Sequence, residues 1–161
     1  MWSMIEYRVT KYDLANRDAT DAYIADEWTS VMDIGRTFAG VILTEDEYRR
    51  VERAYIESAL AFLKEGGLNS LTVEGYENHK DVALDFGESS VFPVEQVGDL
   101  IRQILREEFW CRLEGRGGFL HFGWDYYMYI GVPHHCPEAE HLAKRLGLYA
   151  EEFASPYNEA R

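Results

Sequence analysis

The sequence predicts an α+β fold with a single domain over residues 1–161, in which two long helices and one short helix pack on one face of a mixed or antiparallel sheet. Segments with strand-like alternation flank helical segments in a mixed order, which favours this class over a doubly wound parallel sheet. The chain shows no internal repeat and no low-complexity linker that would divide it. Its 161 residues, 47% of them hydrophobic, suffice to bury a core without disulfides or metals.

The chain begins with a predicted strand over Met4–Tyr12, where apolar and polar residues alternate. The apolar set is Ile5, Tyr7 and Val9. Residues 13–40, which we call the excursion, show no sustained period and are predicted to form a long ordered segment with one short helix near Ser30–Phe38. Because ordered loops of this length are more often functional than idle, the excursion is a candidate binding segment.

The first long helix is predicted to begin after Thr44 and to end at Glu65. Thr44 and Glu47 have the spacing of a capping box, in which side chains satisfy the free amides of the first turn. Apolar residues then recur at helical spacing and give the helix one apolar face: Tyr48, Val51, Tyr55, Ala59 and Phe62. Gly66 and Gly67 stop the helix.

A strand over Leu68–Tyr76 and an irregular polar stretch over residues 77–92 are predicted next. Pro93 suits the first turn of the second long helix. Because apolar residues keep helical spacing after this proline, we predict that the helix runs to about Glu114. The glycine-rich stretch 115–118 ends it.

The last part of the chain is predicted to contain a hairpin, a short helix and a final strand. The aromatic segment Phe119–Val132 is typical of a hairpin that turns near residues 123–125. Pro137–Leu146 is predicted as the short helix, because a proline opens the segment and Gly147 follows its end. Leu148–Phe153 is predicted as the final strand.

Net charge restricts the partners of the chain. It carries 29 acidic and 16 basic residues, for a formal charge of −13. A field of this sign repels phosphate backbones and anionic lipid heads, so we predict neither nucleic acid nor a membrane as a partner. The field favours fast encounter with a basic protein. A soluble acidic protein without any such partner is the other interpretation of the same charge.

The cysteines and the hydrophobic runs predict a cytoplasmic protein. The chain has two cysteines, Cys111 and Cys136, which is fewer than the disulfide framework of a secreted protein usually contains. We therefore expect both thiols to be reduced. Cys111 falls late in the second predicted helix, where a core position is expected. The first ten residues are interrupted by Glu6 and Arg8 and lack the apolar core of a signal peptide, and no run reaches transmembrane length.

Two surfaces are candidates for binding a protein partner. The first is the acidic part of the excursion, with Asp21, Asp26, Glu27, Trp28 and Asp33. The second is the hairpin, whose tyrosines are large, rigid and polar at the tip: Tyr126, Tyr127 and Tyr129. Two alternatives stay open, in which Trp28 pins the excursion onto the core of the domain or the hairpin is buried on both sides.

An enzyme centred on the loop His134–Cys136 is the alternative function. Imidazole and thiolate are the usual zinc ligands, and a cysteine beside a histidine can act as a nucleophile. However, adjacent histidines in a strand point to opposite faces, and no second cysteine pair or HExxH spacing is present. Such a metal-dependent or thiol enzyme would use His121, His134, His135, Cys136 and His141. Nucleotide-binding and serine-hydrolase motifs are missing too, and our first interpretation has no catalytic residue, cofactor or bound metal.

Three parts of the sequence carry a family resemblance: Asp26-Glu27-Trp28-Thr29-Ser30 with Asp33-Ile34-Gly35, the aromatic run His121–Gly131, and the C-terminal run Glu151–Tyr157. Together they resemble a family of small bacterial proteins proposed as immunity proteins of polymorphic toxin systems. The resemblance spans nearly the whole chain and implies a small cytoplasmic domain that binds a toxin domain and blocks it. It implies no active site. An acidic protein of this kind is suited to covering a basic toxin surface.

Overall fold

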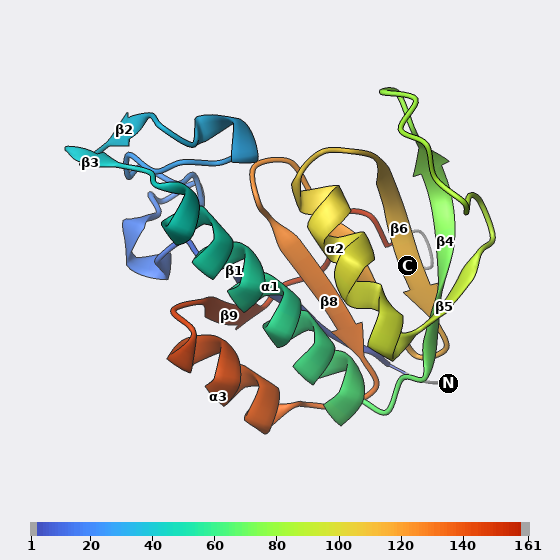
Figure 1. The fold of residues 1–161 in the computed structure, drawn as a ribbon. Helices are drawn as coiled ribbons and strands as arrows, with labels where there is room; N and C mark the ends of the chain where they lie inside the picture. The colour runs from blue at the N-terminus through green and yellow to red at the C-terminus, as the bar shows by residue number, and fades with distance from the viewer. Residues whose placement is uncertain (1–2, 159–161) are drawn as a thin grey trace.

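A seven-stranded sheet organises residues 3–158, the part of the chain that the computed structural model describes (Figure 1). Neighbouring strands are antiparallel, in the order β5-β4-β6-β7-β8-β1-β9. The strands are β1 (Ile5–Thr10), β4 (Ser70–Glu77), β5 (Val91–Pro93), β6 (Trp110–Gly115), β7 (Gly118–Phe122), β8 (Met128–Val132) and β9 (Tyr149–Glu152). With the helices described next, this sheet confirms the predicted α+β class.

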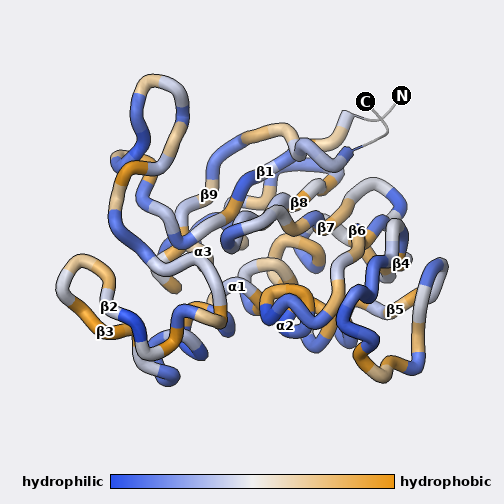
Figure 2. Tube along the Cα trace, turned by 90° about the horizontal axis from the view of Figure 1, so that it is seen from above, coloured by the Kyte–Doolittle hydropathy of each residue, from blue (hydrophilic) through white to orange (hydrophobic). Residues whose placement is uncertain are grey.

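Three helices within residues 3–158 pack beside this sheet: α1 (Glu45–Glu65), α2 (Val97–Leu105) and α3 (Pro137–Arg145). Figure 2 shows α1 and α2 on the same side of the sheet, and α3 packs against both α1 and the edge strand β9. Short 3-10 turns are η1 (Leu14–Asn16), η2 (Val31–Asp33) and η3 (Val94–Gln96). Across residues 3–158, no helix has both the length and the apolar character needed to cross a membrane.

Helix α1 forms as the sequence predicts. Thr44 caps its N-terminus, and the threonine hydroxyl accepts a hydrogen bond from the Glu47 amide at 3.1 Å. The helix ends at Glu65 and buries its apolar face in the core, where Tyr55 and Phe62 are fully buried. Burial of each such aromatic side chain stabilises the fold by about 2 kcal/mol.

The second helix is shorter than predicted. α2 ends at Leu105 rather than near Glu114, because Glu107 adopts a left-handed conformation with a φ of 61° that a helix does not accommodate. The residues that follow form β6, in which buried Cys111 and Leu113 alternate with less buried neighbours. Cys111 is thus a core residue, as expected, but it lies on a central strand and not on a helix.

The excursion is ordered but contains little helix. In place of the predicted helix over Ser30–Phe38, it has the single turn η2, where the Ser30 hydroxyl accepts a hydrogen bond from the Met32 amide at 3.1 Å. Gly35, with a φ of 92°, then turns the chain away from a helical path. A small hairpin follows and projects from the body of the molecule (Figure 1). Its strands are β2 (Thr37–Phe38) and β3 (Val41–Ile42).

The C-terminal segment, residues 153–158, covers part of the sheet face opposite α1 and α2. In Figure 1 this segment passes behind the sheet. The Ser155 hydroxyl contacts His121 of β7, and the Tyr157 ring lies 5.6 Å from the Trp110 ring of β6. The centre of the sheet is therefore covered on both faces, which agrees with the alternative of a hairpin buried on both sides.

Candidate functional site

A pocket of about 230 Å³ opens where four segments of the chain meet, within residues 29–30, 77–80, 104–110 and 122–126. These segments are the approach to η2, the end of β4 and the turn after it, the end of α2 with the turn into β6, and the loop between β7 and β8. We call this cavity the edge pocket. Because its walls are far apart in the sequence, only the folded chain forms it.

Aromatic side chains line much of the edge pocket: Phe109, Trp110, Phe122, Trp124 and Tyr126. Phe109, Phe122 and Tyr126 are buried and form a fixed wall, whereas Trp124 is 78% exposed. The Trp110 indole N–H donates a hydrogen bond to the Phe122 carbonyl at 2.8 Å, which fixes the orientation of that ring. A large exposed indole beside an apolar pocket marks a surface that gains free energy when another molecule covers it.

The loop that carries Trp124 has a strained backbone. Asp125 and Tyr126 have φ angles of 63° and 68°, and Glu107, also in the pocket lining, has a φ of 61°. The Tyr126 hydroxyl donates a hydrogen bond to the Tyr48 hydroxyl at 2.6 Å, and burial raises the pKa of both phenols, so both remain protonated. Strain of this kind persists where the surrounding structure enforces it, and it clusters at functional sites.

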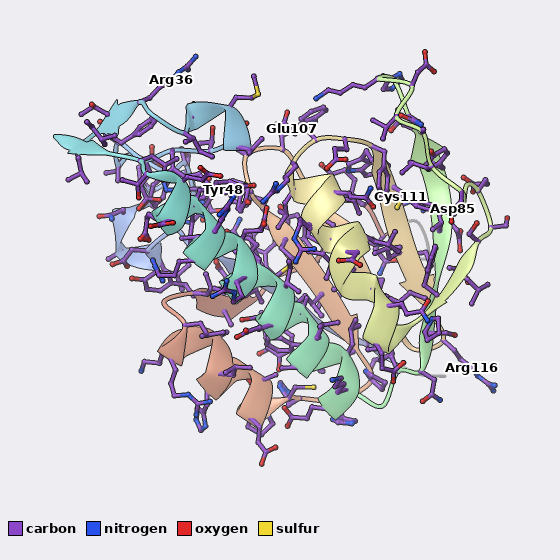
Figure 3. All side chains as sticks on the ribbon, viewed as in Figure 1. Arg36, Tyr48, Asp85, Glu107, Cys111 and Arg116 are labelled. Carbon is purple, nitrogen blue, oxygen red and sulfur yellow. The ribbon has the colours of Figure 1, made fainter. Side chains whose placement is uncertain are left out.

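The rim of the edge pocket is acidic. Its carboxylates are those of Glu77, Glu107, Glu108 and Asp125. Lys80 and His79 are the basic residues of the lining. Within residues 3–158, the rim carboxylates other than that of Glu77 form no ion pair. Glu107 accepts a hydrogen bond from the Ser30 hydroxyl at 2.6 Å, and Figure 3 shows it between η2 and the end of α2. With four carboxylates in the lining and Lys80 as its lysine, the rim carries a net negative charge.

Trp28, predicted as a binding residue, lies buried next to this pocket. It is 8% exposed, and its indole packs edge-on against the Tyr126 ring with the centroids 5.0 Å apart. The Lys11 ammonium lies 4.2 Å from the indole centroid and pairs with Glu27 at 3.0 Å. In this conformation Trp28 fixes the excursion to the core, which matches the alternative interpretation of this residue, and its indole is not presented to a partner.

The predicted acidic residues of the excursion are spread apart and have partners within the chain. Asp21 accepts hydrogen bonds from Arg8 at 3.1 and 3.4 Å, and this contact lowers the pKa of its carboxyl group. Asp26 accepts a hydrogen bond at 2.7 Å from a backbone amide in the turn of the β2–β3 hairpin, and Asp33 accepts one at 2.9 Å from the Thr29 amide. These carboxylates brace the excursion and do not form one continuous surface.

The three tyrosines predicted to bind a partner lie in different parts of the structure. Tyr126 lines the edge pocket from inside the core. Tyr129 points to the opposite face of the sheet, where the C-terminal segment covers it and leaves 7% exposed. Tyr127 is half-buried, and its hydroxyl accepts a hydrogen bond from Arg17 at 3.3 Å. The aromatic side chain that this hairpin presents to solvent is Trp124.

The residues of the alternative enzyme hypothesis do not converge on one point. Three of the histidines are exposed: His134, His135 and His141. Cys136 is fully buried, and its thiol donates to a backbone carbonyl at 3.4 Å. His121 belongs to β7 and points to the opposite face of the sheet, against the C-terminal segment. In the described part of the chain, no three His, Cys, Asp or Glu side chains are placed to hold a metal ion.

Both thiols are expected to resist alkylation in the folded protein. Burial raises the pKa of Cys111 to about 12 and that of Cys136 to about 11, so the reactive thiolate is rare near pH 8. With iodoacetamide and mass spectrometry, we expect labelling at least ~100-fold slower than in the same protein unfolded in urea. A native Cys136 that reacts as fast as in the unfolded chain contradicts this expectation and favours the thiol-enzyme hypothesis.

His121 forms a Ser-His-Glu chain that the sequence did not reveal. Its Nδ1 atom lies 2.7 Å from the Ser155 hydroxyl, and its Nε2 atom lies 2.6 Å from the Glu114 carboxylate. The same residue types form hydrolase triads. Here, however, Ser155 and His121 are fully buried, and the serine oxygen also accepts a hydrogen bond from the Tyr157 amide at 3.1 Å. A substrate has no access to this serine, and the chain of hydrogen bonds instead anchors the C-terminal segment to the sheet.

No protein-family model, curated protein or solved structure matches the chain. Its function is therefore argued from the chemistry of the edge pocket itself. The sequence prediction found segments on two sides of this pocket but missed two exposed side chains of its lining, those of Trp124 and Glu107. The available signal was a tryptophan at the tip of a predicted turn, where folding does not require a large apolar side chain.

Proposed function

We propose that this chain is a toxin-neutralising protein of the immunity type, which acts in the bacterial cytoplasm by binding a basic toxin domain and blocking it. The observation that carries the proposal is the exposed Trp124 indole beside an apolar pocket with an acidic rim. An exposed aromatic anchor of this kind supplies affinity, and the charges around it supply orientation and specificity. The family resemblance of the sequence points to the same function.

The net charge of −13 supports a basic partner. Complementary charge raises the rate at which two proteins meet, and like charge disfavours wrong partners. The acidic rim places part of this charge next to the aromatic anchor, so long-range attraction and docking act at the same place. A toxin domain that acts on a polyanion has a basic active site, and a surface of this composition is suited to covering it.

Exposed apolar side chains also lie on the part of the excursion that follows the pocket residue Ser30, and on β3 after it. Met32 of η2 is 72% exposed, and Val41 and Ile42 of β3 are 70% and 59% exposed. The turn η2 follows directly on the pocket residue Ser30, and the projecting hairpin comes after it, with a hydrophobic stretch that is visible in Figure 2. The pocket and the hairpin together offer a partner apolar contact beside an acidic rim, and protein interfaces combine these two features.

The product of the neighbouring gene is the partner to test. We expect its association rate constant with this protein to fall about tenfold or more between low salt and about 0.5 M NaCl, because salt screens long-range attraction, while the dissociation rate constant changes little. Co-expression should restore growth to cells that express the neighbouring gene product. Absence of binding at both salt concentrations, together with no recovery of growth, refutes the proposed function.

Two charge-matched double variants show whether the edge pocket is the place of encounter. Glu107→Gln with Glu108→Gln alters the rim, whereas Glu57→Gln with Glu138→Gln alters exposed positions on α1 and α3 that do not line the pocket. Both pairs change the net charge equally. The rim pair is expected to slow association more than the control pair, and equal slowing contradicts docking at the edge pocket.

A further inference from the structure

We propose that the edge pocket is a socket for one arginine side chain of the partner protein, whose guanidinium group stacks on the Trp124 indole and hydrogen-bonds to the acidic rim. This inference rests on the proposed function and names the chemistry through which the partner is recognised. Three features of the pocket lead to it: the size, the aromatic lining and the charge.

The size of the edge pocket fits a single long side chain. Its volume of about 230 Å³ is below the roughly 300–1,000 Å³ that pockets for drug-sized ligands and cofactors usually enclose. Besides the aromatic rings, Ile104 and Leu105 contribute apolar surface to the lining. Such walls accept the methylene stem of a basic side chain while its charged end stays at the rim.

The Trp124 indole supplies the aromatic face to which a cation binds most strongly among protein side chains. The molecule already holds one arginine in this way. The Arg8 guanidinium lies 3.8 Å from the Phe153 ring centroid and pairs with the Glu151 carboxylate at 3.1 Å. The edge pocket also combines an aromatic face with carboxylates, and within residues 3–158 no Lys or Arg side chain lies over the Trp124 ring.

The rim carboxylates favour arginine over other occupants. Glu107 and Glu108 belong to the turn between α2 and β6, and Asp125 belongs to the loop between β7 and β8. A guanidinium group is planar and can stack on an indole while its N–H groups bond to a carboxylate, whereas an ammonium group is a strongly hydrated point charge. Anionic groups are repelled by the rim despite Lys80 and His79 in the lining.

A small probe tests this chemistry without the partner. N-acetyl-L-arginine N-methylamide is titrated into ¹⁵N-labelled protein, and the indole N–H signal of Trp124, assigned by its loss in Trp124→Ala, is followed by NMR. We expect saturable binding with a dissociation constant on the order of millimolar, because the probe is a single side chain. The citrulline analogue, which is neutral and nearly the same shape, should bind at least tenfold more weakly, and the lysine analogue at least threefold more weakly. Equal binding of the citrulline or lysine analogue, or no shift with the arginine probe, overturns the assignment to arginine.

Matched variants locate the probe in the edge pocket. Trp124→Ala and Glu108→Gln should each weaken probe binding at least fivefold, the first measured through neighbouring backbone amides. Tyr149→Ala and Glu57→Gln alter another exposed aromatic and another exposed carboxylate that do not line the pocket, and they should leave binding unchanged. Equal losses in both pairs show nonspecific attraction of the cation and overturn the inference.

Binding measurements with the partner protein distinguish a wrong arginine socket from a wrong proposed function. If the neighbouring gene product binds wild-type protein, Trp124→Ala should raise the dissociation constant at least tenfold, with an unchanged melting temperature. Binding that is equally tight in this variant overturns the socket but leaves the proposed function standing. If the arginine probe binds in the pocket but the neighbouring gene product does not bind, the proposed function is overturned. The assignment of the arginine to that partner is overturned with it.

Discussion

Replacement of Trp28 by alanine is expected to lower the free energy of unfolding by about 3–5 kcal/mol, because it leaves a large cavity in a well-packed aromatic cluster. The Trp28 side chain is 8% exposed, and its ring lies 5.4 Å from that of Tyr48 and 5.0 Å from that of Tyr126. The change also removes the aromatic face that lies 4.2 Å from the buried Lys11 ammonium. For a domain of this length, the loss corresponds to a decrease of about 10 °C in melting temperature.

The measurement is urea unfolding followed by circular dichroism, with a thermal melt as a second readout. Trp124→Ala is the matched control, because this tryptophan is 78% exposed and its removal is expected to change the free energy of unfolding by less than about 0.5 kcal/mol. Loss of Trp28 should therefore lower the stability of the fold, whereas loss of Trp124 should weaken partner binding and leave the stability nearly unchanged. Trp28→Ala with wild-type stability and weakened partner binding contradicts the core assignment of this residue.

Alkaline pH is expected to unfold the protein between about pH 9 and pH 12, because buried acids in the core cannot release their protons without unfolding. Burial raises the pKa of Cys136 to about 11 and that of Cys111 and Tyr7 to about 12. It also raises the pKa of Tyr55 and Tyr126 well above the ordinary value of a phenol. The largest cause in each case is desolvation of the charged form.

The sign of the effect follows from the raised pKa values. In the unfolded chain a thiol loses its proton near ~pH 9 and a phenol near ~pH 10, while the folded protein retains both. The unfolded state therefore releases protons first and becomes more favourable as pH rises. Stability is fully present below about pH 8.5 and is lost on the approach to the raised pKa values. For Cys111 alone, the loss amounts to about 3 kcal/mol near pH 11.

Tyrosinate absorbance and circular dichroism, recorded along the same pH titration, test this expectation. The chain has 11 tyrosines, and we expect the buried ones to ionise in the same cooperative step in which the secondary structure is lost. Tyr149→Phe, which removes an exposed phenol, should leave the midpoint nearly unchanged. Gradual ionisation of all tyrosines near ~pH 10, with the dichroism of the folded state retained, contradicts the burial of these phenols in the core.

Local patterns in the sequence were sufficient to predict the helices and strands whose formation depends mainly on neighbouring residues. The alternation of Ile5, Tyr7 and Val9 predicted β1, and the capping box that begins at Thr44 predicted α1, which ends at Glu65 as expected. In α1 the periodicity, the capping residue and the burial pattern agree. In β1 the polar residues Arg8 and Thr10 are buried as well as Tyr7 and Val9, so the alternation of the sequence predicted the strand but not its burial on both faces. A prediction from one sequence is dependable where the periodicity, the capping residues and the burial all indicate the same element.

The boundary between α2 and β6 was mispredicted because tertiary pairing decides it. The spacing of Ile104, Leu105 and Phe109 is compatible with a longer helix, and no glycine or proline interrupts it. The strand forms because residues 110–115 pair with β4 on one side and β7 on the other. The edge pocket depends on the same turn, so a sequence interpretation that extended the helix could not place Glu107 and Trp124 in the lining of one pocket.

The position of β1 in the sheet has a consequence for synthesis of the chain. This strand pairs with β8 and β9, although most of the chain separates it from both. During translation it therefore leaves the ribosome long before either of its neighbours exists. Its edges and the apolar side chains of Tyr7 and Val9 lack their final partners during that time, so we expect aggregation of the nascent chain to be most favoured in this interval.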